Sequence, residues 1–322
     1  MNNHQFIFKS LRFCYRKIFG VHQLASFQGI TDPQKASDLI YSYLMSEKPC
    51  MVARFGSTEL MTMVSYLGVH HLRNRSIIKY IQGKEPDWWW NEKCLSQMCH
   101  WSGFFPPTIE KVEQFCEMMI KDIPHVDILG SWLLDEQYFH KELNKALRVE
   151  FELLNPFFAQ KPWTMALENK KILVVHPYSQ TIESQYNKRD LLFENRHILP
   201  YYDLKTIQAV QSLGGHGHGF SDWFEALEYM KAKMDDTDYD ICLLGCGAYG
   251  FPLAAHAKRK GKKAIHIGGS LQLLFGIKGA RWENPAYNTK YNYATMINEH
   301  WVRPNENEKS KNASQVENAC YW

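Results

Sequence analysis

The stretch "CLLGCGAYGFPLAAHAKRKGKKAIHIGG", residues 242–269, carries the spacing Gly-x-Gly-x-x-Gly at Gly245, Gly247 and Gly250. An apolar run precedes the glycines and a helical pattern follows them. Glycines at such a junction permit a tight turn and let backbone N–H groups approach an anion at the start of a helix. The stretch therefore predicts a strand–loop–helix unit that binds a phosphate-bearing ligand. The alternative is a turn that only requires small residues.

Other short apolar runs predict the remaining strands of a sheet. We expect strands at residues 50–55, 126–130, 171–176, 240–245 and 263–268. Helical patterns lie between them, and one begins at Ser221, the expected N-cap, with Glu225 in its first turn. Strands that alternate with helices predict a Rossmann-like α/β domain, with a mainly parallel sheet and helices on both faces.

The chain divides into three parts. Residues 1–30 are a basic amphipathic segment, residues 31–302 are the α/β domain, and residues 303–322 are a polar tail that we expect to be disordered. Within the domain, residues 80–120 are rich in Trp and Cys and are expected to form a helical insertion. Its indole rings either pack together or offer a stacking platform to a sugar ring; they belong to Trp88, Trp89, Trp90 and Trp101.

Composition argues against several classes of protein. A formal net charge of +3 over 322 residues is too small for a dedicated nucleic-acid-binding protein. No apolar run approaches the roughly 20 residues of a membrane span, and no clean secretory signal is recognisable. The eight cysteines include no Cys-x-x-Cys pair, so we expect reduced thiols and a cytoplasmic protein.

Residues 4–22 predict a basic amphipathic helix. A helical wheel places on one side the apolar residues Phe8, Leu11, Tyr15, Ile18 and Phe19. The cations next to them are Lys9, Arg12 and Arg16. Such a helix either makes peripheral contact with an anionic membrane, at its inner face, or packs on its own domain with a solvated basic edge.

Polar or glycine-rich residues follow each predicted strand. Ligands bind beyond the carboxyl ends of the strands in open α/β sheets, so the five loops predict a single site. In the first loop, Arg54 can bind phosphate or carboxylate through its planar guanidinium, and Gly56 suits the turn into a helix. Glu59, two residues after Ser57, can hold a metal or accept a proton from an attacking hydroxyl. The alternative for Glu59 is a carboxylate that only stabilises the helix start.

The third strand leads to another group of candidates. His176 stands at its end, where the rim of the site is expected. Lys188 and Arg189 follow in the chain and either neutralise a diphosphate or pair with Glu183 and Glu194.

A basic loop near the end of the domain is a further candidate for phosphate binding. It contains Lys278 and Arg281, with glycines between them and before them. The histidine pair His216 and His218 lacks a third ligand nearby in the sequence, which does not favour a metal site there.

The glycine loop also raises the question of NAD. A dinucleotide-binding loop is followed, about 20 residues later, by an acidic residue that holds the ribose 2′-hydroxyl. Here the next strand runs into Gly268, Gly269 and Ser270 without a carboxylate. We therefore expect no NAD and favour another phosphate-bearing ligand, with an NAD(P)-dependent oxidoreductase as the alternative.

Two of these motifs together resemble one family. The stretch "VARFGSTEL", residues 52–60, and the glycine stretch quoted above resemble the GT-D-fold glycosyltransferases of bacterial surface-polysaccharide clusters. The resemblance covers roughly residues 35–285 and implies a GT-D-like variant of the Rossmann fold. It also implies transfer of a sugar from a nucleotide-diphosphate donor, typically UDP-linked, to a glycan or lipid-linked acceptor, as in capsule or O-antigen synthesis.

The family pattern in the first loop is Arg-Phe-Gly-Asp-x-Glu, whose acidic pair is associated with a divalent metal and the donor diphosphate. Arg54, Gly56 and Glu59 match this pattern, but Ser57 stands where the aspartate belongs. The departure weakens the case for bound Mn²⁺ or Mg²⁺, for which Glu59 is the remaining ligand. It also keeps open a catalytically inactive carbohydrate-binding or scaffold protein.

The resemblance and the residues together predict a glycosyltransferase of the hexosyltransferase type. Glu59 is the expected catalytic base, and Arg54 is expected to position the donor. The expected donor-binding residues are Gly56, Ser57, His176, Lys188, Arg189, Gly245, Gly247, Ala248, Tyr249, Gly250, Gly268, Gly269, Lys278 and Arg281. The expected partners are the nucleotide-sugar donor and the acceptor, without nucleic acid.

Overall fold

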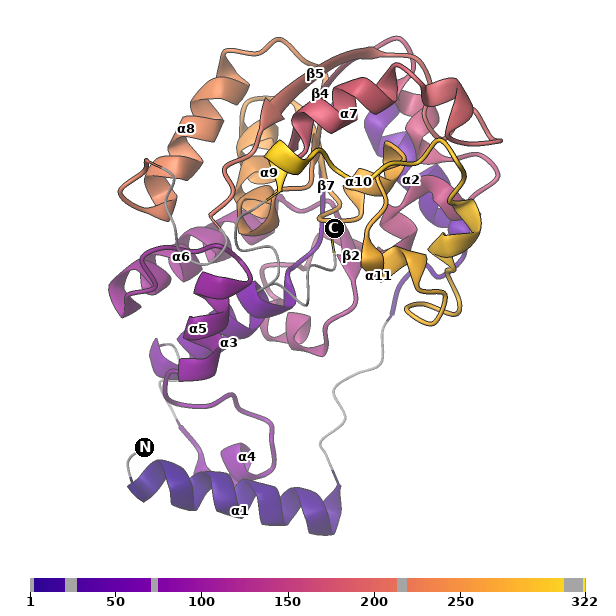
Figure 1. Cartoon of the computed structure of the whole chain (residues 1–322). Coiled ribbons are helices and arrows are strands. Elements are labelled where there is room, and N and C mark those ends of the chain that lie inside the picture. Colours follow the sequence, from indigo (N-terminus) through magenta and orange to yellow (C-terminus); the bar gives the residue numbers. More distant parts are fainter. Residues whose placement is uncertain (1–2, 21–27, 71–74, 213–218, 310–320, 322) are drawn as a thin grey trace.

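A computed structural model describes residues 3–20, 28–70, 75–212, 219–309 and 321. Seven strands in these residues form one sheet in the order β3-β2-β1-β7-β6-β4-β5, and every pair of neighbours is parallel (Figure 1). The strands are β1 (Met51–Ala53), β2 (Ile128–Ser131), β3 (Leu147–Glu150), β4 (Lys171–His176), β5 (Asp203–Gln208), β6 (Ile241–Leu244) and β7 (Lys263–His266). The predicted α/β class with a parallel sheet is confirmed.

Helices cover both faces of the sheet, and each face has its own hydrophobic core. Alternate residues of a strand point to opposite faces, so Cys242 and Leu244 of β6 lie in one core and Ile241 and Leu243 in the other. The first core is closed by α3 (Ser57–His70), α6 (Ile109–Asp122), α8 (Trp223–Asp235) and α9 (Gly250–Arg259). The second is closed by α2 (Pro33–Met45), α7 (Ser179–Tyr186), α10 (Leu271–Leu274) and α11 (Ala280–Glu283).

The predicted insertion at residues 80–120 belongs in part to this architecture. It contains α5 (Glu92–His100) and most of α6, and α6 packs against α3 and α9. Phe115 and Met119 of α6 are buried in the first core. This second half of the segment is therefore a regular covering helix of the sheet.

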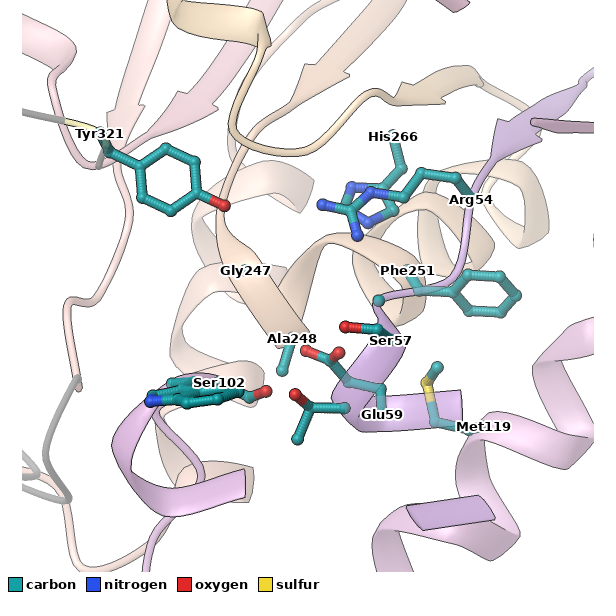
Figure 2. Close-up of a pocket in the computed structure, with 13 residues that line it drawn as sticks. Arg54, Ser57, Glu59, Ser102, Met119, Gly247, Ala248, Phe251, His266 and Tyr321 are labelled. Carbon is teal, nitrogen blue, oxygen red and sulfur yellow. The ribbon is translucent and has the colours of Figure 1, made fainter. Parts of the chain in front are cut away.

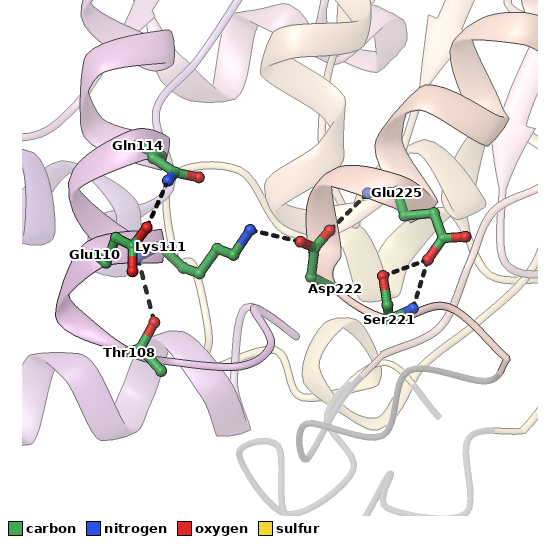
Figure 3. A network of polar contacts seen from close by, with 7 residues as sticks. All are labelled: Thr108, Glu110, Lys111, Gln114, Ser221, Asp222 and Glu225. Carbon is green, nitrogen blue, oxygen red and sulfur yellow. Dashed lines mark hydrogen bonds and ion pairs between the residues drawn. The ribbon is translucent and has the colours of Figure 1, made fainter.

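The start of α8 lies one residue later than expected. Asp222 is its N-cap, because the Asp222 carboxylate accepts a hydrogen bond from the backbone N–H of Glu225 at 2.8 Å. Ser221 instead donates its hydroxyl to the Glu225 carboxylate at 2.6 Å (Figure 3). Lys111 of α6 pairs with Asp222 at 2.7 Å, so the same carboxylate also ties α8 to α6.

The N-terminal helix lies where the sequence predicted one, whereas the last described residues differ from the expected disordered tail. Helix α1 (Asn3–Phe19) packs against α4 (Ile77–Ile81) at one end of the molecule (Figure 1). Its expected apolar side is divided, since Phe8 is half-buried whereas Leu11 is exposed. Residues 303–309 are part of the packed domain rather than a disordered tail, and Glu308 is 1% exposed.

Two general findings concern membranes and thiols. None of the helices in the described residues combines the length and apolar character needed to cross a bilayer. The cysteines in the described part of the chain are free thiols.

Candidate functional site

The candidate site lies at the carboxyl ends of the three adjacent strands β1, β7 and β6. Helix α3, which follows β1, packs on one face of the sheet, whereas α10, which follows β7, packs on the other. Such a reversal between neighbouring strands opens a crevice at the edge of a parallel sheet. A cavity of about 120 Å³ occupies this place (Figure 2). It is lined by residues that follow β1 and β6, by the last residue of β7, His266, and by residues 101–102, Met119 and the distant Tyr321.

Arg54 enters the cavity from the end of β1. Gly268, after β7, has a φ of +85°, and a Cβ atom there would lie 2.1 Å from Nη2 of Arg54. The guanidinium therefore rests against a bare backbone. Arg54 Nη1 donates to the carbonyl of Phe55 at 3.2 Å, and the buried Nε has no hydrogen-bond partner among the described residues. A buried donor without a partner is unusual, and a bound anion would satisfy it.

Glu59 lies in the first turn of α3 and is 9% exposed. Its carboxylate folds back over Gly56, where a Cβ atom would lie 1.8 Å from Oε2. Ser57 opens the same helix at the edge of the cavity, and its side chain and that of Glu59 face the same space (Figure 2). The N–H groups of the first turn lack partners within the helix and make this end of α3 electropositive.

The three glycines of the Gly-x-Gly-x-x-Gly motif have different structural roles. Gly247 adopts a φ of +58° and lines the cavity together with Ala248. Gly245 and Gly250 do not line it; a Cβ atom on them would lie 2.6 Å from His176 and 2.2 Å from His266. Gly245 and Gly250 are therefore required for close packing, as in a turn that only needs small residues. Gly247 lines the cavity and is compatible with a ligand-binding loop.

His176 and Tyr249, both expected to bind the donor, are directed into the protein. His176 is 2% exposed, burial lowers its pKa to about 3, and its Nδ1 accepts the N–H of Tyr178 at 3.0 Å. Tyr249 stacks on Trp223 with ring centroids 4.8 Å apart. Both expectations are corrected, because neither side chain lines the cavity.

The expected basic residues are spread over different places. Arg189 lies over the rings of Tyr186 and Tyr201, at 5.3 and 5.2 Å, and neither it nor Lys188 lines the cavity. Lys278 also lies outside the cavity lining and pairs with Glu283 at 3.5 Å.

Arg281 and Gly269 line a second cavity, of about 40 Å³, next to the first. The two cavities share Arg54 and Tyr321 in their linings. The hydroxyl of Ser270 is buried there without a hydrogen-bond partner in the described part of the chain. The loop after β7 thus lines the second cavity, whereas β7 itself contributes His266 to the first.

Several residues of the first cavity were not expected, and His266 and Tyr321 are two of them. His266, at the end of β7, has its pKa lowered to about 3 by burial and by the nearby positive charge of Arg54, so its imidazole is neutral. Its position at the end of a predicted strand was the feature of the sequence that could have identified it as a site residue. Tyr321 accepts a hydrogen bond from Gln272 on its carbonyl, at 3.1 Å, and Arg281 lies over its ring at 4.8 Å. Nothing in the polar sequence around Tyr321 indicated that this residue lies at the cavity.

The side chains of the site offer few ligands for a divalent metal. No group of three or more His, Cys, Asp or Glu side chains in the described residues is placed to hold a metal ion. Glu59 is the one acidic side chain in the described lining of the first cavity, and a single carboxylate does not fit the ligand set that Mn²⁺ or Mg²⁺ requires. The pair His216 and His218 lies outside the described residues.

No protein-family model, no curated protein and no solved structure matches this chain. The resemblance to GT-D-fold glycosyltransferases therefore rests on the two motifs quoted for it.

Proposed function

We propose that the chain is a glycosyltransferase that moves a sugar from a nucleotide-diphosphate donor, UDP-linked, to a glycan or lipid-linked acceptor in surface-polysaccharide synthesis. The observation that carries the proposal is the shared cavity: Arg54, Glu59 and the Gly247–Ala248 turn all line it. One strong cation, one carboxylate and two electropositive chain turns within one crevice suit a reaction that expels a diphosphate.

The donor diphosphate would be bound by Arg54 and by the two turns. Arg54 offers Nε and Nη2 toward an anion, since Nη1 is engaged with Phe55. The first turn of α3 and the turn at Gly247 present backbone N–H groups at helix starts, where anions are favoured. Charge neutralisation then comes from the protein itself, and Arg54 stabilises the negative charge that the leaving nucleoside diphosphate acquires.

Glu59 would act as the base. As the acceptor oxygen forms its bond to the anomeric carbon, the acceptor hydroxyl gives its proton to the Glu59 carboxylate. The bond from the anomeric carbon to the diphosphate oxygen breaks, and the oxygen keeps the electron pair. Trp101 is 41% exposed and lines the same cavity, so its indole is available for stacking on a sugar ring.

The test is the substitution Glu59→Gln. Transfer should be lost, while donor affinity should change by less than about tenfold, or 1.4 kcal/mol, because the amide keeps the size of the side chain. Glu110→Gln, in the first turn of α6 away from the cavity, is the matched control and should retain full transfer. Loss of donor binding in Glu59→Gln would make Glu59 a ligand-holding residue instead of a base.

The donor class is tested by thermal shift with UDP, UDP-sugars, GDP-sugars, CMP-sugars and NAD(P). A ligand at 100 times its dissociation constant stabilises the folded state by about 2.7 kcal/mol. Stabilisation by NAD(P) alone would favour the oxidoreductase alternative. Binding of a sugar nucleotide without transfer or hydrolysis would favour the inactive carbohydrate-binding alternative.

A further inference from the structure

Helix α1 carries a row of exposed apolar side chains on the side that faces away from the rest of the molecule. At 100° per residue, one half of the helix surface holds nearly all of its large exposed apolar residues. They are Phe6, Ile7, Leu11, Phe13 and Ile18, with exposed fractions from 45% to 73%. Nothing in the described residues covers them. An exposed apolar surface of this kind marks a site of interaction.

The opposite side of α1 attaches the helix to the protein. Phe8 packs edge-on against Tyr80 and Trp88, with ring centroids 6.2 and 5.8 Å apart. Arg12 forms an ion pair with Asp87 at 3.2 Å and lies over the ring of Tyr80 at 4.9 Å. These contacts fix which side of the helix faces inward, so the exposed apolar row is a consequence of how α1 packs.

The charge of α1 identifies the partner chemistry. The helix contains four cations and no acidic residue, and Lys9, Arg16 and Lys17 among them are exposed. The adjoining α4 also has two exposed apolar side chains, Ile77 at 50% and Ile78 at 68%. We call α1 and α4 together the α1–α4 face. It combines apolar side chains that can enter a bilayer with cations that are attracted to anionic headgroups.

We propose that the α1–α4 face docks on an anionic phospholipid surface, with α1 lying in the plane of the interface. A second copy of the chain fits less well, because a two-fold pairing of this face would bring the three exposed cations of α1 against the same three of the other copy. The proposal is independent of the proposed sugar transfer. If both hold, docking places the cavity in the same compartment as a lipid-linked acceptor.

The experiment is sedimentation of the full chain with vesicles. The chain should bind vesicles of phosphatidylcholine mixed with phosphatidylglycerol and bind pure phosphatidylcholine much more weakly. Raising the salt from about 0.1 to 0.5 M should release it, because screening removes the electrostatic attraction. Equal binding to both kinds of vesicle, or to neither, would overturn the proposal.

Two pairs of variants separate the apolar and the charged contributions. Ile7→Gln with Ile18→Gln should lower binding at least tenfold, whereas Leu134→Gln with Leu191→Gln, which removes side chains of similar exposure elsewhere, should not. Arg16→Gln with Lys17→Gln should lower binding about 30-fold. The control that removes two exposed lysines elsewhere, Lys141→Gln with Lys145→Gln, should leave it within a few-fold.

Circular dichroism and the midpoint of thermal unfolding, unchanged in all variants, show that the fold is intact. Loss of vesicle binding in the control pairs to the same extent would overturn the proposal. So would a stable dimer that Ile7→Gln with Ile18→Gln dissociates, since a second copy would then occupy the face.

Discussion

Gly268 lies where the loop after β7 meets the Arg54 guanidinium. Its positive φ of +85° is a conformation that side chains with a Cβ atom disfavour, and its Cβ position is occupied by Arg54 Nη2. The two constraints have different consequences. Backbone strain affects stability, whereas the displaced guanidinium affects the site, because the far end of a flexible side chain can move aside.

Comparison of two glycines separates these effects. Gly261 also has a positive φ, +77°, but a Cβ atom there would contact nothing within 4 Å. Both Gly268→Ala and Gly261→Ala should lower the free energy of unfolding by about 1–2 kcal/mol. Only Gly268→Ala should also weaken donor binding, by at least tenfold, as measured by titration calorimetry. Equal donor affinities in the two variants would show that the position of Arg54 is unimportant for binding.

At the level of single residues, the sequence predicted the site only in part. Arg54, Glu59 and Gly247 were expected together, because strand ends of a parallel sheet converge and these residues follow two strands. The sequence could not show that Gly245 serves packing, since its role depends on His176 from another strand. Tyr321 contacts Arg281 in the second cavity, although the two residues are 40 positions apart in the sequence. A local sequence pattern cannot predict a contact between residues so far apart.

At the scale of elements, helix α7 is held at its start by a residue from the far end of the domain. The Glu308 carboxylate accepts hydrogen bonds from the backbone N–H groups of Gln180 and Thr181, at 2.7 and 3.1 Å, and from the Thr181 hydroxyl. A carboxylate suits the positive end of a helix, and this one is almost fully buried. The interaction explains why residues 303–309 are packed in spite of their polar sequence.

Removal of this cap should be costly. We expect Glu308→Ala to lower the free energy of unfolding by about 2–4 kcal/mol, because buried N–H groups lose a charged acceptor. Urea unfolding measures the change. Glu306→Ala, at an exposed position two residues earlier, is the control and should change stability by less than about 0.5 kcal/mol. A Glu308 variant as stable as the control would mean that α7 does not depend on this carboxylate.

The sequence predicted those strands that are buried on both faces of the sheet. The five central or near-central strands are continuous apolar runs, and all five were expected. The two missed strands, β3 and β5, are the edges of the sheet and are partly exposed, with the polar sequences "LRVE" and "DLKTIQ". An edge strand has a single neighbour and needs less apolar surface, so hydrophobic patterns do not reveal it.

At the scale of the whole molecule, two buried histidines at strand ends are expected to make the stability of the fold depend on pH. His176 ends β4 and His266 ends β7, and burial lowers the pKa of each to about 3 from an ordinary value of 6.5. The unfolded chain therefore binds a proton at each imidazole below about pH 6.5, and the folded chain does so only near pH 3. Between these values the unfolded state binds more protons, so stability falls as the pH falls.

The free energy of unfolding should accordingly decrease between pH 6.5 and pH 3, by up to about 1.4 kcal/mol per pH unit for each histidine. Urea unfolding at a series of pH values measures this slope. His266→Gln should be less stable at pH 7 but should show a shallower slope, because one proton uptake is removed. Carboxylates elsewhere also influence the slope, and they do so in the unsubstituted chain and in the variant alike. A slope that His266→Gln leaves unchanged would mean that this imidazole accepts a proton in the folded protein, and the cavity would then hold a second cation beside Arg54.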